Sequence, residues 1–305
     1  MINQVVHPVY NKFNSALDMI GNTPLVKINN MHNNKVNIYA KIEGNNPGGS
    51  IKDRIALEMI EAAEKNNELT KNKVILEATS GNTGIGLAMI ATIKGYDITL
   101  TMSESVSEER KKILRAYGAT IIQTPAKFGT DGAIKKAHEI YEKNKEKYWM
   151  SNQFSNPNNP LAHYNNTATE ILQQLPEITT FISAIGTSGT LMGTSKRLKE
   201  YNKNIQIVAI EPTLGHKVQG LKNMKEAIVP EIFNENAYDT KIQIEDEDAY
   251  ETARILAKKE GLLVGMSTGA AMAGAIKTAE QMKEGNIVVI FPDRGEKYLS
   301  TTLFE

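Results

Sequence analysis

Short β-rich runs alternate with longer helical patterns along almost the whole chain, and this alternation constrains the fold more than any other feature. The runs with the composition and length of strands are VNIYAKI (36–42), KVILEAT (73–79), DITLTM (97–102), ATIIQT (119–124), TTFISAI (179–185), IQIVAIE (205–211) and NIVVIF (286–291). The helical patterns lie near 51–65, 83–94, 106–117, 131–145, 161–174, 189–201, 246–260 and 268–283. Such alternation predicts an α/β protein whose mostly parallel, twisted sheets carry helices on both faces.

Length and composition limit the classes of protein to which the chain can belong. Its 305 residues suffice for two small domains or one large α/β unit, and the turn-rich segment SNPNNPLAHYNN (155–166) is the expected boundary between two halves. Lys plus Arg and Asp plus Glu both number 35, which argues against a nucleic-acid partner. The sequence shows no long apolar run and no basic-then-apolar leader, so we expect no membrane partner and a cytoplasmic location.

Residue types that build covalent cross-links and metal sites are scarce. The chain contains no cysteine, which excludes disulfides, thiolate metal sites and a cysteine nucleophile. The 5 histidines are scattered without the spacing of metal ligands. We therefore expect no metal.

Three loops that open predicted helices are rich in Gly, Ser and Thr: TSGNTGIG (79–86), GTSGT (186–190) and GMSTGAA (265–271). Small residues there expose backbone N–H groups and hydroxyls at a helix start, which suits a carboxylate or a phosphate. Simple turn and cap roles are the alternative for any one loop. Three such loops in one parallel α/β chain favour a site for an anionic small molecule. None has the pattern typical of dinucleotide or nucleoside-triphosphate sites.

The stretch NNPGGSIKDRI (45–55) places one lysine at the start of a predicted helix. Ser50 is the expected N-cap, and Pro47 with the two glycines suits a tight turn that a ligand can approach. Lys52 would lie in the first turn, where the helix's partial positive charge disfavours an ammonium. A solvent-exposed lysine is the alternative. Combined with an anion-binding loop, such an amine suits pyridoxal 5′-phosphate, an aldehyde cofactor that carries a phosphate.

Eight motifs occur together and in order along the chain. They are IGNTPLV (20–26), NNPGGSIKDR (45–54), TSGNTGIGLA (79–88), NQFSNPNNP (152–160), GTSGT (186–190), GHKVQG (215–220), GMSTGAA (265–271) and GEKYLST (295–301). In these motifs the chain resembles the cysteine synthase (O-acetylserine sulfhydrylase) and cystathionine β-synthase family of fold-type II pyridoxal-phosphate enzymes. The resemblance implies a tryptophan-synthase-β-like fold with two domains. The smaller, mobile domain is expected at 46–150 and carries the loop for the substrate carboxylate; the larger, cofactor-binding domain is expected at 1–45 plus 151–305.

The resemblance implies a role for each matching residue. Lys52 stands where the family has its Schiff-base lysine, and it is also the natural base for the substrate's α-proton. Asn82 matches an asparagine that bonds the cofactor's ring oxygen, and Ser267 matches a serine that faces the pyridine nitrogen. The phosphate cradle is matched by Gly186, Thr187, Ser188, Gly189 and Thr190, with Ser188 in place of the more usual glycine. The groups for the amino-acid carboxylate are matched by Thr79, Ser80, Gly81, Thr83 and Gln153.

The implied reaction is β-replacement on an activated serine or cysteine. O-acetylserine plus sulfide would give cysteine plus acetate through an aminoacrylate. The segment LKNMKEAIVPEIFNENAYD (221–239) replaces a stretch that is glycine-rich in the family's sulfhydrylases. Its charged residues either only solvate a surface loop or change which second substrate the enzyme accepts. The alternative function is therefore a sulfide-releasing cysteine β-lyase, or a cystathionine or lanthionine β-synthase. A cofactor-binding protein without turnover is a third hypothesis, against which the complete set of cofactor residues argues.

The resemblance also implies the partners. They are a small amino acid, sulfide or a thiol, and a second copy of the chain in a homodimer. Some sulfhydrylases of the family bind the tail of a serine acetyltransferase in the active site, which adds such a tail as a candidate partner.

Overall fold

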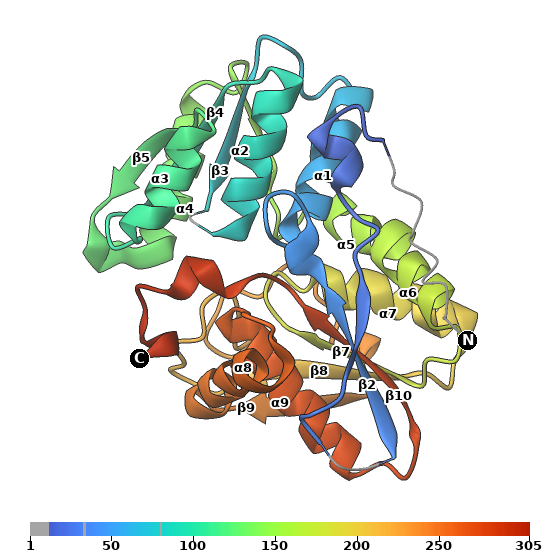
Figure 1. The fold of residues 1–305 in the computed structure, drawn as a ribbon. Coiled ribbons are helices and arrows are strands. Elements are labelled where there is room, and N and C mark those ends of the chain that lie inside the picture. The colour runs from blue at the N-terminus through green and yellow to red at the C-terminus, as the bar shows by residue number, and fades with distance from the viewer. Residues whose placement is uncertain (1–11, 33–34, 80) are drawn as a thin grey trace.

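The computed structural model describes residues 12–32, 35–79 and 81–305. It contains two sheets, one in the upper and one in the lower part of the molecule as drawn (Figure 1). The larger sheet has the strand order β1-β2-β10-β7-β8-β9, and the smaller has the order β5-β4-β3-β6. Among the described strands, β1 and β2 pair antiparallel and all other neighbours pair parallel.

The elements follow one another with short connections. The strands are β1 (Leu25–Ile28), β2 (Val36–Ile42), β3 (Val74–Ala78), β4 (Ile98–Ser103), β5 (Thr120–Thr124), β6 (Tyr148–Met150), β7 (Thr180–Ala184), β8 (Gln206–Pro212), β9 (Thr240–Ile244) and β10 (Gly285–Phe291). The α-helices are α1 (Lys52–Lys65), α2 (Asn82–Lys94), α3 (Glu108–Ala116), α4 (Gly129–Lys143), α5 (Asn158–Ala162), α6 (Ala168–Gln174), α7 (Gly189–Tyr201), α8 (Asp246–Glu260) and α9 (Met266–Glu280). A π-helical turn, His163–Thr167, joins α5 to α6.

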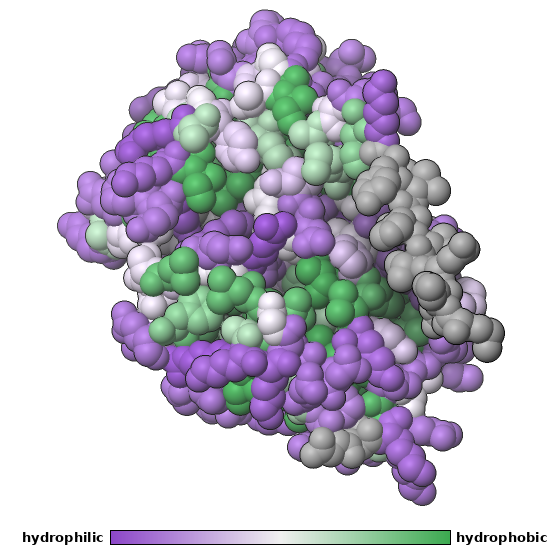
Figure 2. All heavy atoms as spheres, in the orientation of Figure 1, coloured by the Kyte–Doolittle hydropathy of each residue, from purple (hydrophilic) through white to green (hydrophobic). Residues whose placement is uncertain are grey.

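Both faces of each sheet are covered. Side chains of α8 and α9 pack on one face of the six-stranded sheet, and side chains of α6 and α7 pack on the other. In the four-stranded sheet, α1, α2 and α3 cover one face and α4 covers the other. Central strands such as β10 are buried on both sides and therefore read as near-continuous apolar runs, as NIVVIF does. Polar side chains cover most of the face seen in Figure 2, and apolar ones gather across its middle.

The predicted α/β class is confirmed, and all seven predicted strands form, within one or two residues of their predicted bounds. Three strands were missed. β1 and β9 have four and five residues and lie at the edges of the large sheet, and β6 has three residues. β1 and β6 carry too few residues to show a period, and β9 (TKIQI) is mostly exposed with only two apolar residues, so only their pairing partners reveal them as strands.

Two local predictions were wrong. The segment 155–166 is not a loop over most of its length, because α5 begins at Asn158 and the chain stays helical through the π turn. Its two prolines fall at the N-cap and in the first turn, where a missing N–H leaves no helical bond unmade. Helix α1 begins at Lys52 with Ile51, not Ser50, as its N-cap. The Ser50 hydroxyl still accepts a bond of 3.2 Å from the Lys52 backbone N–H.

None of the helices in the three described ranges is both long and apolar enough to cross a membrane.

Candidate active site

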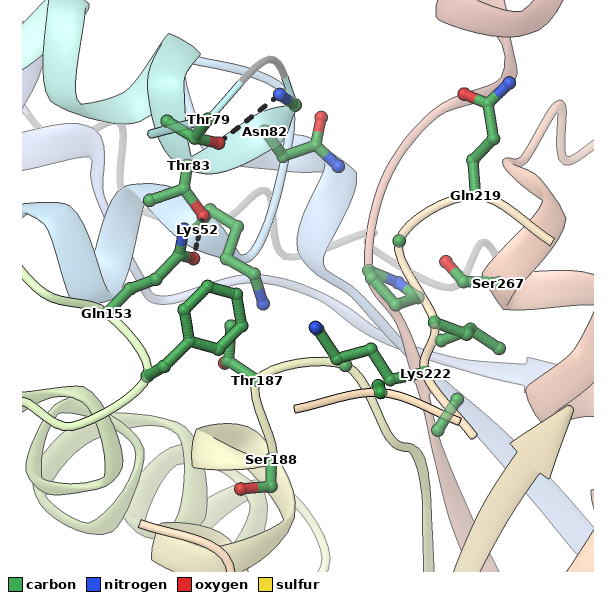
Figure 3. A pocket seen from close by; sticks show the side chains of 18 of the residues that line it. Lys52, Thr79, Asn82, Thr83, Gln153, Thr187, Ser188, Gln219, Lys222 and Ser267 are labelled. Atoms are coloured by element: carbon green, nitrogen blue, oxygen red, sulfur yellow. Dashed lines mark hydrogen bonds between the residues drawn. The ribbon is translucent and has the colours of Figure 1, made fainter. Parts of the chain in front are cut away.

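A cavity of about 440 Å³ opens where the carboxyl ends of strands from both sheets lead into helices. Its wall includes almost every residue that the sequence motifs singled out (Figure 3). These are Lys52, Thr79, Gly81, Asn82, Thr83, Gln153, Gly186, Thr187, Ser188, Thr190 and Ser267. Gly189 lies directly behind the wall as the first residue of α7. The predicted site residue Ser80 lies outside the described residues.

Lys52 is the first residue of α1, and its side chain reaches into this cavity (Figure 3). The side chain is half-buried, which contradicts the alternative of a solvent-exposed lysine. Burial lowers the pKa of the Lys52 ammonium to about 8, and the charges of Asp293 and Glu43 offset only part of that effect. The ammonium makes no hydrogen bond or ion pair with any described residue. With this pKa about a tenth of the Lys52 amines are neutral at pH 7, far more than for an ordinary lysine, so the amine can act as a nucleophile or a base.

The segment from Gly186 to Thr190 contains the end of the loop after β7 and the first two residues of α7, and it forms one end of the cavity. A side chain at 186 would lie 2.6 Å from the Gly220 carbonyl oxygen, and one at 189 would overlap Asn159 Oδ1. Both positions therefore need glycine. The first N–H groups of α7 have no acceptor within the helix, so the loop and helix start together form a cradle that fits the phosphate of pyridoxal phosphate.

Ser188 adopts the left-handed conformation, with φ 71°. This backbone geometry favours glycine, since a Cβ is disfavoured there by roughly 1 kcal/mol. The Ser188 hydroxyl is buried and has no hydrogen-bond partner among the described residues. The loop thus keeps its turn, and with it the outward N–H groups, in spite of the substitution.

The described residues predicted for the amino-acid carboxylate come from two places: Thr79, Gly81 and Thr83 lie at the start of α2, and Gln153 lies in the loop after β6. The Thr83 hydroxyl donates to Gln153 Oε1 at 2.7 Å (Figure 3). Among the described residues, no acceptor is found for the Gln153 amide nitrogen, which leaves it available to a ligand in the cavity. The loop that carries Gln153 is anchored by Ser151, whose hydroxyl donates to the buried carboxyl of Glu77. Burial raises the pKa of Glu77, and its hydrogen bonds to the loop offset part of that rise.

The side chain of Asn82 is held by groups from the C-terminal part of the chain. Its Nδ2 donates to Asp293 Oδ2 at 2.8 Å, and its Oδ1 accepts from Lys297 Nζ at 2.8 Å. Tyr298 also donates to Asp293 Oδ2, at 2.7 Å. Burial raises the pKa of Asp293, against the lowering effects of Lys297, Asn82 and Tyr298.

Sequence reasoning missed this network of Asp293, Lys297 and Tyr298. The motif GEKYLST contains two of its members, but nothing local to the motif indicated that they contact Asn82, more than 200 residues earlier (sequence separation 211 for Asn82–Asp293). Ser267 is found where the motif predicted it, in the first turn of α9 and on the cavity wall.

The segment 221–239 contributes charge to the cavity through one half-buried lysine. Lys222 Nζ lies 4.7 Å from the centre of the Phe154 ring, and burial lowers its pKa while Asp131 raises it in part. Glu226 lies at the rim and accepts a bond of 2.7 Å from the Gly215 N–H. Lys225 and Glu231 are exposed. The structure is therefore compatible with both hypotheses for the segment. Most of its charged positions belong to a solvated loop, whereas Lys222 adds a charge to the cavity wall.

In the part of the chain that the structure describes, no cluster of three or more His, Asp or Glu side chains is arranged to hold a metal ion.

Comparison with known proteins identifies the family. The family described as "Pyridoxal-phosphate dependent enzyme" matches residues 16–293. The chain belongs to this family. Pyridoxal-phosphate-dependent chemistry agrees with the cavity, because an unpaired amine of low pKa and a helix-start cradle are the two groups that the cofactor requires.

Individual relatives of this pyridoxal-phosphate enzyme are similar over almost their whole length. A "Cysteine synthase" from Aquifex aeolicus (strain VF5) is 46% identical over 300 residues, which cover 95% of this chain and 92% of that protein. A solved "hydrogen sulfide-producing enzyme" from Fusobacterium nucleatum is 46% identical with a TM-score of 0.89, covering 94% of this chain and 100% of that one. A solved "Cysteine Synthase (OASS)" from Entamoeba histolytica is 36% identical with a TM-score of 0.93, covering 98% and 93%.

The close approach at Gly189 gives a first prediction. Replacing a helical glycine by alanine ordinarily stabilises a protein by about 1 kcal/mol, but the Gly189→Ala methyl group would overlap Asn159 Oδ1. We expect the opposite sign, a loss of about 1–3 kcal/mol, together with weaker cofactor binding. Urea unfolding of the cofactor-free protein and a cofactor titration measure the two effects. Lys196→Ala, at an exposed position of the same helix, is the control and should change neither. A Gly189→Ala protein as stable as the wild type would contradict the close approach.

Proposed function

We propose that this enzyme catalyses β-replacement, making cysteine and acetate from O-acetylserine and sulfide. The observation that carries the proposal is that Lys52, with its lowered pKa, shares one cavity with a phosphate cradle at 186–190 and a second helix start at Thr79–Thr83. An amine, a phosphate site and a carboxylate site are what an amino-acid reaction on pyridoxal phosphate needs. The cysteine synthases of similar sequence support the choice of reaction.

Different residues of this chain are assigned to different parts of the cofactor. The loop 186–190 holds the phosphate, Asn82 bonds the ring oxygen and Ser267 faces the ring nitrogen. When bound, the cofactor supplies an electron sink for the bonds at the substrate's α-carbon. A neutral serine beside the ring nitrogen does not hold a proton there as a carboxylate would. This keeps the electron sink weak and favours loss of a β leaving group over transamination.

Substrate binding is assigned to the loop before α2 and to Gln153. Thr79, Ser80, Gly81, Thr83 and Gln153 hold the amino-acid carboxylate, with the free Gln153 amide donating to it. Lys52 then removes the α-proton, because its lowered pKa leaves a neutral amine available near neutral pH. Closure of the Thr79–Thr83 loop over the carboxylate would exclude water from the reacting atoms.

A second candidate function has the same first half-reaction, loss of the β leaving group, but a different leaving group and a different second substrate. Lys222 brings a desolvated cation into the cavity from a segment that departs from the family's glycine-rich stretch. A relative of 46% identity is described as a hydrogen sulfide-producing enzyme. The alternative is therefore that the enzyme releases sulfide from cysteine, with water or a thiol such as homocysteine or a second cysteine as acceptor.

One assay distinguishes the two functions. The purified, cofactor-loaded protein is given O-acetylserine with sulfide, and separately cysteine alone. The visible spectrum and the products, cysteine or sulfide, are then followed. We expect kcat/KM for cysteine formation to exceed that for sulfide release by at least about tenfold, a difference of about 1.4 kcal/mol in transition-state free energy. The reverse ratio would assign the enzyme to sulfide release. A protein that stays colourless with added cofactor would contradict both functions.

The same assay tests the role of 221–239. Exchanging residues 221–229 for a glycine-rich segment removes Lys222, and we expect the ratio of the two activities to change at least about threefold. An equivalent exchange of the exposed residues 143–147 is the control. An unchanged ratio in the first exchange would show that 221–229 does not select the second substrate.

The proposal extends to domains and assembly. The strands of the four-stranded sheet all lie within 74–150, whereas those of the other sheet lie within 25–42 and 180–291. This division supports domains at 46–150 and at 1–45 plus 151–305, and family resemblance supports a mobile smaller domain. Family resemblance supports a homodimer in the cytoplasm and a serine acetyltransferase tail as a further partner. Light scattering, cell fractionation and titration with a tail peptide test these three points.

A further inference from the structure

Two fully buried polar side chains lie behind the phosphate cradle and take no part in the chemistry proposed above. Asn159 is on α5 and His163 opens the π turn, and each is 0% exposed. Helix α7, which begins at the cradle, packs against this segment (Figure 1). The contact is close because a side chain at Gly193 would overlap the Pro160 carbonyl oxygen. The cradle therefore rests on a rigid support that contains two hydrogen-bonding groups.

Asn159 contacts the hydroxyl of Thr187. Its Nδ2 donates to the Gln153 carbonyl oxygen at 2.7 Å and to Thr187 Oγ1 at 3.1 Å. A carbonyl oxygen can only accept, so the amide nitrogen must face Gln153, and the orientation of the amide is determined. Since an amide nitrogen can only donate, Thr187 Oγ1 must accept. The hydroxyl proton of Thr187 is then free to point into the cavity.

His163 contacts the hydroxyl of Thr190. Its Nδ1 lies 2.9 Å from Thr167 Oγ1, and its Nε2 lies 3.2 Å from Thr190 Oγ1. Burial, with smaller effects from the charges of Lys52 and Arg54, lowers the pKa of His163 well below its usual value. The ring is therefore neutral, with one nitrogen that donates and one that accepts.

The tautomer of His163 decides what Thr190 can do. If Thr167 donates to Nδ1, the proton of the ring is on Nε2 and is donated to Thr190 Oγ1, which leaves the Thr190 hydroxyl proton for the cavity. In the other tautomer the ring proton is on Nδ1, so Thr190 must donate its hydroxyl proton to His163 Nε2. Only the lone pairs of Thr190 Oγ1 would then face an anion in the cradle. The first tautomer is the one that an anion in the cradle stabilises.

We propose that Asn159 and His163 are positioning residues that hold Thr187 and Thr190 as hydrogen-bond acceptors, so that both hydroxyl protons donate to the cofactor phosphate. The inference rests on the proposed assignment of 186–190 to the phosphate. It gives the cradle two charge-assisted hydrogen bonds in addition to the backbone N–H groups of α7. Through the Gln153 carbonyl, Asn159 also ties the phosphate cradle to the loop proposed for the substrate carboxylate.

A double-mutant cycle tests the link between His163 and Thr190. The cofactor-free variants His163→Phe, Thr190→Val and the double variant are titrated with inorganic phosphate and with pyridoxal phosphate. Each single change is expected to weaken binding about tenfold, because one hydrogen bond to a charged group is lost. If His163 acts through Thr190, the double variant loses about tenfold as well, whereas independent effects would multiply to about 100-fold. The ³¹P resonance of the bound cofactor should shift alike in all three variants.

Two further variants separate positioning from general packing. His163→Gln places an amide that can donate near the position of Nε2, and we expect it to restore binding to within about threefold of wild type. His163→Asn is too short and should not. His138→Phe, at an exposed position of α4, is the matched control for introducing phenylalanine. The pair Asn159→Leu and Thr187→Val forms a second cycle, with the same expected non-additivity.

The outcomes distinguish this inference from the proposed function. A wild-type protein that does not bind the cofactor would overturn the assignment of the cradle itself. A Thr190→Val protein that binds as tightly as wild type would overturn the role of the Thr190 hydroxyl, and with it the positioning role of His163, while the backbone N–H cradle would remain. A tenfold loss in Thr190→Val with additive losses in the double variant would overturn the positioning role alone. Thermal unfolding shows whether His163→Phe folds. If it does not, the comparison of His163→Gln with His163→Asn tests the positioning role instead. Equal cofactor binding by these two variants would contradict that role.

Discussion

Replacing Lys52 by methionine is expected to lower kcat by at least ~10⁴-fold and, at the same time, to make the cofactor-free protein more stable at pH 7. The loss of turnover follows because the only amine proposed both to hold the cofactor and to move the α-proton is removed. The gain in stability follows because folding half-buries the Lys52 ammonium, which has no partner among the described residues. A residue that weakens the fold but is required for the reaction is typical of an active site.

The pH dependence gives the sign of the stability effect. The pKa of Lys52 is about 8 in the folded protein and 10.5 without the effects of folding. Below pH 8 both states carry the proton, and Lys52→Met should raise the free energy of unfolding by about 3 kcal/mol. Between pH 8 and 10.5 the unfolded chain binds more protons, so the wild type gains stability as the pH rises. Above 10.5 the two proteins should be equally stable.

Urea unfolding of the cofactor-free proteins at several pH values measures this difference. Lys65→Met, at the exposed C-terminal end of the same helix, is the matched control and should leave both activity and stability nearly unchanged. A Lys52→Met protein that is less stable than wild type at pH 7 would show that Lys52 is a structural lysine.

Replacing Arg54 by methionine is expected to destabilise the protein by about 3–5 kcal/mol, the largest stability effect that the structure predicts. The Arg54 guanidinium is buried and bonds two carboxylates, Glu43 at 2.6 Å and Glu170 at 2.6 Å. Lys41, also buried, bonds Glu170 at 2.7 Å. Without Arg54, two buried carboxylates share one lysine, so at least one negative charge loses its partner. Because Arg54 follows Lys52 by two residues on α1, we expect the same change also to loosen the start of the helix that presents the Lys52 amine, the proposed catalytic group.

Acid unfolding reports on the same cluster. Burial alone would raise the pKa of Glu170, but bonds to Arg54 and the charges of Arg54 and Lys41 outweigh it and lower that pKa to about 2. A carboxyl with a depressed pKa stabilises the fold above its ordinary pKa of 4.5, and this contribution is lost as the pH falls from 4.5 through 2. In Arg54→Met most of that dependence should disappear.

The control for Arg54 is an arginine in an exposed ion pair. Arg197 lies 3.9 Å from Glu200 with both side chains nearly half exposed, and Arg197→Met should change stability by less than about 0.5 kcal/mol. Equal effects of Arg54→Met and Arg197→Met on urea unfolding would contradict the structural role of the buried cluster.

Local sequence patterns were sufficient for the strands and loops that have strong local signals. The sequence of β10 is a long apolar run, which predicts a buried strand. The loop before α7 is rich in glycine and threonine, which predicts a tight turn at the start of a helix. The three missed strands and the π turn have no such signal. A strand of three residues such as β6 exists because β3 pairs with it, and Asn158 can begin a helix because both nearby prolines fall where no helical N–H is needed.

The sequence by itself determined the α/β class, and it indicated Lys52 as the amine proposed for catalysis and 186–190 as the proposed phosphate cradle, because turns, helix starts and apolar runs depend on neighbouring residues. Only the tertiary structure decided the environment of those groups. It joined Arg54 to Glu170 across 116 positions and Asn82 to Asp293 across 211. It also lowered the pKa of Lys52 and placed Asn159 and His163 behind two threonine hydroxyls. Desolvation and hydrogen-bond partners depend on which distant segments pack together, and no local pattern carries that information.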